Sequence, residues 1–513
     1  MKTFIIQNKG HLSILLIFFF AFGIRMYRLF QKEDVFTDEG ASFFYSNYID
    51  VDFRKNFNNH SLYNGDFICS KLLYNDNSLK DVKNDILNLR RDSRDKSHTN
   101  LYYSILRLWF TGIETYNLKK VVFHAVLLNL LFFCLSFYFL SKLLKKLYVN
   151  QLFILLTLII AYLNSGSITN TLYIREYQMQ EFFIVLYTYI LVVFYDRIKN
   201  DFPLKWNDTL YILLATTGLL LSGYFTIIYF ILINFIFLII SYNKIPRQYY
   251  LYLFLTYCLS LVCVAIVYPK FYDFYNFTVH RKDSLFAVKE SNEFIINLSN
   301  SLKKYWIDLR GYFISLPALF LFLLVIVFSI VKRASTFKQL PFLLGICALI
   351  SSLIIYLFAP FKGILYIMPL LPIISLIITS FITKFSHKQI LIASILFSLI
   401  YLEKSFTRND VFFAAVPISE TYKTNPKTLA IISPNVELYS ILPYFDKNRL
   451  FLFPAANKEI DNSIKTILNF EDKVFFIHSN NSNSDNTFFA SGNILLKERF
   501  KVSWYYYGDL LSK

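Results

Sequence analysis

Two neighbouring carboxylates, Asp38 and Glu39, follow shortly after the first long apolar segment of the chain, His11–Phe30. An acidic pair is costly to hold near lipid unless it is paired or used. The two groups could bind a divalent cation, or one could act as a general base while the other orients it. The alternative is the solvated start of a loop, although the apolar residues of Gly40–Tyr45 argue against full solvation.

A histidine and an arginine-glutamate pair are the next candidates for chemistry. His98 precedes an amphipathic segment and could take part in proton transfer, phosphate binding or metal binding; the alternative is an ordinary surface histidine. Arg175, Glu176 and Tyr177 lie in a short connection between two apolar segments. The planar fork of an arginine suits a phosphate diester, but the arginine could equally pair with Glu176 at the membrane surface.

A lysine within Ala359–Pro369 is the fourth candidate. Lys362 stands at the expected start of a helix, where its ammonium could neutralise a lipid phosphate. Pro360 and Gly363 indicate a tight turn around it. A lysine at a membrane edge is common, so this residue gains weight only together with the other three motifs.

The elements that must position these residues are membrane helices. Of the 513 residues 55% are hydrophobic and only 17% are charged, which indicates a polytopic membrane protein. At a rise of 1.5 Å per residue, about 20 apolar residues cross a bilayer, and the pattern predicts about eleven spans. They lie near residues 12–30, 119–143, 151–168, 178–196, 209–221, 223–241, 249–268, 312–331, 340–358, 362–383 and 388–402.

The distribution of charge predicts the orientation of these spans. The net charge of +17 is concentrated in short loops without Asp or Glu, which alternate with loops that carry acids. This positive-inside pattern explains the charge without a nucleic-acid partner. It places the N-terminus in the cytoplasm, and the C-terminal part and all four motifs on the outer side of a cell (inner or plasma) membrane. The basic loops contain Lys142, Lys145 and Lys146; Lys244 and Arg247; Lys332, Arg333 and Lys338; and Lys384 and Lys388.

Two domains are expected. Residues 1–404 form an all-α transmembrane domain, whose first external loop, 31–118, ends in an interfacial helix at Leu101–Phe110. Residues 405–513 are expected to form a small external α/β domain. Its predicted strands are 428–433, 449–453 and 473–478, and its predicted helices are 436–445 and 458–470.

Several classes of site are absent from the sequence. The chain has no glycine-rich nucleotide loop, no nucleophile elbow, no His-Glu-x-x-His zinc motif and no cysteine spacing typical of metal sites or disulfide frameworks. A nucleotide-sugar substrate on the cytoplasmic side is therefore not expected. Four polar motifs at the outer interface indicate a lipid-borne substrate with an anionic headgroup.

In their order along the chain the four motifs resemble those of the membrane glycosyltransferases of the GT-C fold. The resemblance is to the bacterial branch similar to dolichyl-phosphate-mannose protein mannosyltransferases and to the aminoarabinose transferase of lipid A. Two prolines that follow the histidine in that family are missing here, and Leu365 stands where relatives often have arginine. The matching segments are Phe36-Thr-Asp-Glu-Gly-Ala41, His98-Thr-Asn-Leu-Tyr-Tyr103, Arg175-Glu-Tyr-Gln178 and Ala359-Pro-Phe-Lys-Gly-Ile-Leu-Tyr-Ile-Met-Pro369.

The resemblance implies transfer of a sugar from a polyprenyl-phosphate donor to a hydroxyl acceptor (a protein, a lipid or a polysaccharide) with inversion. Asp38 would be the base, and Glu39 would support it or share a metal with it. The family includes metal-dependent and metal-independent members, so a divalent cation at this pair is left open and no other cofactor is implied. The donor phosphate would be bound by Arg175, Lys362 and His98, and the substrate contacted by Glu176, Tyr177, Tyr102 and Tyr366.

Two other functions stay open. A transporter or flippase of lipid-linked glycans tends to have charged or broken helices in mid-membrane. The predicted spans are nearly free of ionisable residues at their centres, which disfavours transport. A non-catalytic scaffold would lose its function on removal of residues 410–513, while Asp38→Asn would have no effect.

Overall fold

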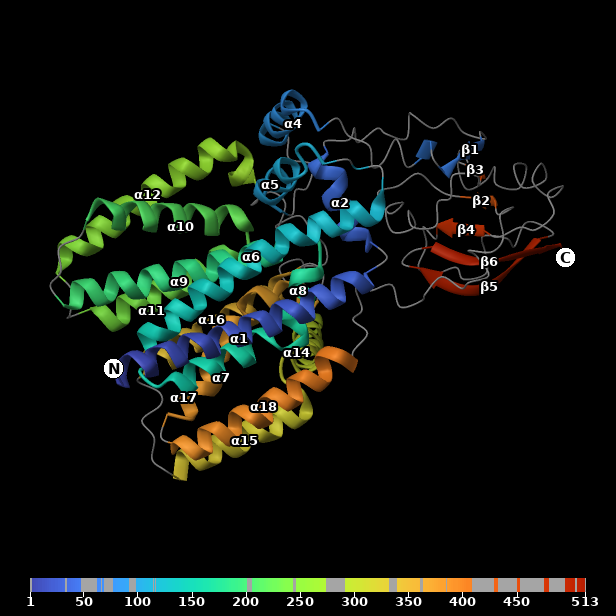
Figure 1. The fold of residues 1–513 in the computed structure, drawn as a ribbon. Coiled ribbons are helices and arrows are strands. Elements are labelled where there is room, and N and C mark those ends of the chain that lie inside the picture. The colour runs from blue at the N-terminus through green and yellow to red at the C-terminus, as the bar shows by residue number, and fades with distance from the viewer. Residues whose placement is uncertain are drawn as a thin grey trace. The chain divides into compact units, whose positions relative to one another are not determined.

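The computed structural model describes most of the chain up to residue 407 and short segments beyond it. Within these residues the protein is almost entirely helical up to residue 407 and forms strands after it (Figure 1). The described residues are 2–32, 35–47, 62–65, 67–68, 77–91, 98–113, 115, 117–200, 205–242, 246–273, 291–331, 339–359, 363–383, 385–407, 429–431, 450–452, 475–478, 494–502 and 505–512.

Five helical stretches of the described residues are long and apolar enough to cross a membrane, and seven if each of two bent pairs is one span. The protein is therefore a multi-pass membrane protein. The predicted number of about eleven spans is not confirmed, partly because α10 (Trp206–Ser222) and α11 (Thr226–Ser241) have only 17 and 16 residues. The five stretches are His11–Gln31 of α1 (Lys2–Gln31), α6 (Leu118–Leu147), α12 (Arg247–Val267), α16 (Leu340–Phe358) and Ile364–Phe381, which ends in α17 (Leu371–Phe381).

Both bent pairs depart from the sequence prediction. The expected span 151–168 is broken into α7 (Gln151–Tyr162) and α8 (Ser165–Leu172), whose axes differ by 58°. Asn164 in the break accepts a hydrogen bond from the backbone N–H of Ser167 and so begins a new helix. The second pair is α14 (Ser291–Tyr312) and α15 (Leu316–Val331), bent by 96°, and most of α14 lies where an external loop was expected.

The chain divides into two compact units. The first consists of residues 1–29, 90–102 and 126–408. In it α9 (Tyr177–Lys199) packs against α10, and α10 against α12 (Figure 1). The core of this unit includes α17, in which all the residues are buried, and α17 packs against α7 and α16. The last helix, α18 (His387–Thr407), packs against α7 and α15.

The second unit consists of residues 30–89, 103–125 and 409–513. It therefore combines the first predicted loop with the C-terminal segment. Its helical elements include α2 (Thr37–Ser46), most of α4 (Leu79–Arg91) and most of α5 (Leu101–Trp109). Helix α5 confirms the helix expected at Leu101–Phe110, and its location on a membrane surface stays a prediction.

Two three-stranded sheets belong to the second unit. In the first, β3 (Leu450–Leu452) lies between β1 (Leu62–Asn64), which is antiparallel to it, and β2 (Leu429–Ile431), which is parallel. In the second, β6 (Tyr505–Ser512) lies between β4 (Phe475–His478) and β5 (Ile494–Val502), both antiparallel to it. Strands β2, β3 and β4 fall on the three predicted strands. The two predicted helices, 436–445 and 458–470, lie outside the described residues.

Candidate functional site

His98 and Glu176, from two separate sequence motifs, are in contact. The Nδ1 atom of His98, just before α5, contacts Oε1 of Glu176, in the turn between α8 and α9. Arg175 lies on the other side of the same carboxylate, with its Nε 3.6 Å from Oε2 of Glu176. All three side chains are buried, and Glu176 is only 1% exposed. The structure thus brings the second and third motifs together in the first unit.

Aromatic side chains extend this group to the fourth motif. The ring of Tyr177 stands nearly perpendicular to the ring of His98, with centroids 6.4 Å apart, and nearly perpendicular to the half-buried Tyr366, at 6.0 Å. Lys362, which belongs to the same motif as Tyr366, lies outside the described residues. We refer to His98, Arg175, Glu176, Tyr177 and Tyr366 as the His98 cluster.

The position of the cluster depends on hydrogen bonds around the turn between α8 and α9. The hydroxyl of Tyr102 donates to Oδ1 of Asn129, at 3.1 Å, and Nδ2 of Asn129 donates to the carbonyl of Tyr173, at 2.7 Å. Within the turn the N–H of Arg175 donates to the same carbonyl, at 2.8 Å. Tyr102, expected to contact the substrate, is fully buried, and the bond from its hydroxyl positions this turn.

The charges around Glu176 determine its protonation. Burial alone would raise the pKa of this carboxyl group, but the positive charges of His98 and Arg175 outweigh burial and lower the pKa to about 2. Glu176 is therefore ionised at neutral pH. Its carboxylate lies between the side chains of His98 and Arg175, in the turn before α9.

The acidic pair lies in the second unit, and its two members differ in exposure. Asp38 and Glu39 are both in the first turn of α2, but Asp38 is exposed and Glu39 is fully buried. Oε2 of Glu39 accepts a hydrogen bond from the backbone N–H of Phe36, at 2.8 Å, which satisfies one free donor of the helix start. The same oxygen lies 3.0 Å from Nζ of Lys32.

The surroundings of Glu39 do not fit the suggestion of a shared metal. Its carboxylate already pairs with an ammonium group and caps a helix, so the pair does not offer two open carboxylates to a divalent cation. No group of three or more His, Cys, Asp or Glu side chains among the described residues is arranged to hold a metal ion.

Two buried charged residues within the predicted spans were missed from the sequence. Arg25 of α1 and Glu181 of α9 lie within predicted spans, and both are fully buried. Arg25 lies near the end of the predicted span 12–30 and Glu181 near the start of the span 178–196, so the centres of these two spans carry no ionisable residue. A charged residue inside an apolar span was the signal that could have identified them. Lys32 was also missed, since nothing in its spacing links it to Glu39.

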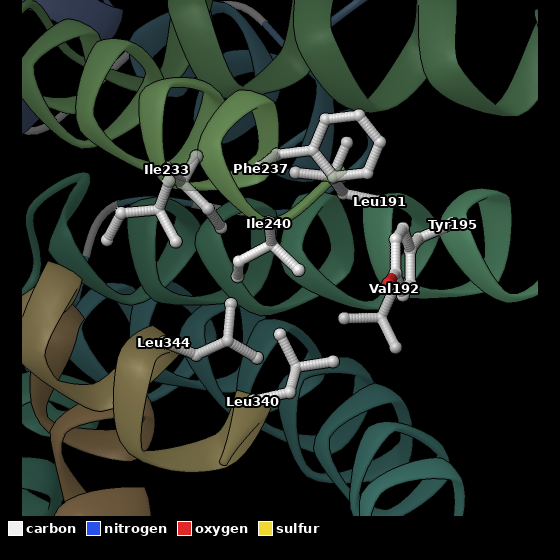
Figure 2. A pocket seen from close by; sticks show the side chains of 9 residues that line it. Leu191, Val192, Tyr195, Ile233, Phe237, Ile240, Leu340 and Leu344 are labelled. Carbon is white, nitrogen blue, oxygen red and sulfur yellow. The ribbon is translucent and has the colours of Figure 1, made fainter. Parts of the chain in front are cut away.

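An apolar pocket lies elsewhere in the first unit, between α9, α11 and α16 (Figure 2). On α9 it is lined by Leu191, Val192 and Tyr195, near the end of the helix opposite to Tyr177. The hydroxyl of Tyr195 is the one side-chain polar group among the nine lining residues. The pocket is therefore separate from the His98 cluster.

The comparisons with known proteins find similarity among solved structures. No protein family matches the chain, and no curated protein matches it in sequence. Among solved structures the chain is similar to the crystal structure of ArnT from Cupriavidus metallidurans bound to undecaprenyl phosphate, with 9% sequence identity and a TM-score of 0.48. The alignment covers 96% of this chain and 97% of that one. A likeness of this size carries no residue role and no activity over to this chain.

Proposed function

We propose that the protein is an integral membrane glycosyltransferase. It would transfer a sugar from a polyprenyl-phosphate donor to a hydroxyl acceptor (protein, lipid or cell-surface glycan) at the outer face of the membrane. The observation that supports this best is the His98 cluster, because residues of three separate motifs contact one another in it. A binding site for one ligand requires that its residues lie together, whereas three separately solvated loop ends would have no reason to contact one another.

The donor half of the reaction needs positive charge at the phosphate. A polyprenyl phosphate leaves readily once its developing charge is neutralised. We assign this task to Arg175, with His98 as a further contact, and Glu176 keeps both side chains in place through the contacts described above. Lys362 is assigned to the same phosphate from its motif. Tyr177 and Tyr366 are assigned to the substrate.

The acceptor half needs a base. We assign it to Asp38, because it is the exposed member of the acidic pair. Asp38 would take the proton of the acceptor hydroxyl while the acceptor oxygen forms a bond to the anomeric carbon. The bond from that carbon to the phosphate oxygen breaks, and the polyprenyl phosphate leaves with the electron pair. This single displacement inverts the anomeric carbon.

A flippase of lipid-linked glycans is the second candidate, favoured by one observation. A broken helix next to a buried arginine and glutamate is an arrangement typical of transporters. Such a protein would move the glycolipid across the bilayer without forming a new glycosidic bond. The two functions therefore differ in their products.

Mass spectrometry of surface glycans and lipids from a deletion strain tests the proposal. The strain is complemented with the wild type, with Asp38→Asn, or with Asp81→Asn as a control. Asp81 is a matched control because, like Asp38 in α2, it lies in the first turn of a helix, α4. We expect the wild type and the control to restore the glycan, and Asp38→Asn to accumulate the donor instead. Restoration by Asp38→Asn would refute the base. A donor that accumulates on the cytoplasmic face of the membrane, where it cannot be used for transfer, would indicate the flippase instead.

A further inference from the structure

The break between α7 and α8 is built by specific side chains. Where a membrane helix breaks, its freed backbone groups need new partners, because lipid provides none. Asn164 supplies some of them. Its Nδ2 donates to the carbonyls of Ile160, at 2.9 Å, and Ala161, at 2.8 Å, in the last turn of α7.

Arg25 of α1 joins the two sides of this break. Its Nη1 donates to the carbonyl of Tyr162, the last residue of α7, at 3.1 Å. Its Nη2 and Nε donate to the hydroxyls of Ser167, at 2.8 Å, and Thr171, at 2.9 Å, on α8. The guanidinium also stacks on the ring of Phe133, 3.9 Å from its centroid. One rigid fork therefore fixes the end of α7 to two successive turns of α8.

Glu181 makes the matching connection between α8 and α9. Its carboxylate accepts hydrogen bonds at 2.9 Å from Asn170 of α8, from Gln178 of α9 and from Ser136 of α6. The hydroxyl of Thr171 donates to Oε1 of Gln178, at 2.8 Å. Arg25 and Glu181 are therefore linked through Thr171 and Gln178 in one fully buried network.

We infer that Arg25 and Glu181 are positioning residues for the His98 cluster, an inference that rests on the proposed function. The turn that carries Arg175 and Glu176 connects the end of α8 to the start of α9. Arg25 determines the direction in which α8 runs after the break, and Glu181 holds the first turns of α9 against α8. The network thereby fixes both ends of the turn, and with it the side chains that we assign to the donor phosphate.

The bonding of Arg25 also distinguishes this role from transport. The guanidinium makes four hydrogen bonds, counting one to the carbonyl of Ala21 at 3.0 Å. A substrate passing through the network would have to break bonds that no lipid can replace. A buried guanidinium held by several hydrogen bonds is suited to a fixed geometry. Loss of these hydrogen-bond partners would leave its charge uncompensated.

The test uses variants that disturb the link by different amounts. Arg25→Lys keeps the charge but loses the fork, and Thr171→Val removes only the linking hydroxyl, so that it still folds if Arg25→Lys does not. Thr188→Val is the matched control. The hydroxyl of Thr188 is equally buried on α9, but it bonds to Ile184 and Tyr229, outside the network.

Two measurements are made on the purified full-length protein in detergent. Hydrogen exchange followed by mass spectrometry reports on the backbone of residues 173–176, and a titration measures binding of a polyprenyl monophosphate. We expect faster exchange in the turn and about tenfold weaker binding for Thr171→Val and Arg25→Lys, as the loss of a buried hydrogen bond implies. Thr188→Val should change neither.

The two measurements separate this inference from the proposed function. Unchanged exchange at 173–176 in both network variants, or an equal effect of Thr188→Val, would overturn the positioning role. Faster exchange with unchanged phosphate binding would overturn it as well, because the turn would then have moved without consequence for the ligand. If the wild type itself does not bind the lipid phosphate, the proposed function fails, and with it the assignment of this turn to the phosphate.

Discussion

Nζ of Lys32 lies 3.0 Å from Oε2 of Glu39, and both side chains are almost completely buried. Glu39 is adjacent in sequence to the exposed Asp38, so two neighbouring carboxylates of one motif have different surroundings. Glu39 has the surroundings of a structural group, whereas the side chain of Asp38 is exposed. The sequence left two roles open for Glu39, support of Asp38 or a share in binding a metal. The contacts of Glu39 favour support of Asp38.

The Lys32–Glu39 pair predicts a compensating double variant. Lys32→Met removes the cation that faces a buried carboxylate, and Glu39→Gln removes the anion that faces a buried ammonium group, so each should cost roughly 3–5 kcal/mol of stability. The double variant Lys32→Met/Glu39→Gln should recover most of this loss, because glutamine can still accept the hydrogen bond of the helix start. The midpoint of thermal unfolding in detergent measures all three.

An exposed ion pair provides the control for this cycle. Lys146 and Asp196 are 2.9 Å apart, with side chains 46% and 45% exposed. Because solvent screens such a pair, Lys146→Met should cost less than about 1 kcal/mol. A double variant of the buried pair as unstable as its worse single variant would show that the two charges do not compensate each other.

The same double variant separates the roles of the two acids in catalysis. We expect Lys32→Met/Glu39→Gln to keep most of the glycan product in the complemented deletion strain, whereas Asp38→Asn should lose it by about 10²-fold or more, the usual contribution of a general base. The amount of membrane-inserted protein is measured in parallel. An inactive but stable double variant would mean that Glu39 takes part in the reaction itself.

Glu176 predicts a window of acid sensitivity. Its pKa is lowered from 4.5 in a free side chain to about 2 in the folded protein. The stability that its ionised form contributes is therefore fully present above about pH 5 and is lost as the pH falls through the folded pKa. The difference in thermal midpoint between the wild type and Glu176→Gln should stay constant from neutral pH to about pH 5 and shrink below it. A constant difference down to the lowest pH at which the protein stays folded would contradict this assignment.

Arg175 predicts a specific loss of phosphate binding. A charge-assisted hydrogen bond contributes about 1.5–3 kcal/mol, so Arg175→Gln should weaken binding of a polyprenyl monophosphate by roughly one to two orders of magnitude. Arg175→Lys should restore only part of it, since a lysine lacks the planar fork. Arg197→Gln is the control, because Arg197 pairs with Asp208 near the other end of α9. Wild-type affinity in Arg175→Gln would remove the residue from the site.

Much of the arrangement could be predicted from apolar segments and motifs. Hydropathy identified most of the long helices, and the motif order brought His98, Glu176 and Tyr366 into consideration before any contact was known. The strands β2, β3 and β4 followed from short runs of apolar residues. Each of these predictions depends on a local sequence pattern, and such patterns can be recognised in a single sequence.

The contacts between distant residues could not be predicted in the same way. Three of the four hydrogen bonds of Arg25 involve partners on α7 and α8 that no periodicity connects to α1. The salt bridge of Lys32 joins this residue to the first turn of α2, a contact that no sequence pattern indicates. Strand β1 has only three residues, and it exists because β3 provides its hydrogen-bond partners, more than 380 residues later in the chain.

This pairing of β1 with β3 affects how the protein is made. The antiparallel partner of the segment Leu62–Asn64, Leu450–Leu452, is synthesised more than 380 residues after it. The loop that carries Asp38 must therefore wait for nearly the whole membrane domain to be inserted before its sheet can close. A truncation after residue 409 removes β3 and leaves the edge of β1 without its strand. Loss of activity in such a truncation could therefore result from incomplete folding of the first external loop or from loss of a partner that binds residues 410–513. Point variants in β3 distinguish these two causes better than the truncation does.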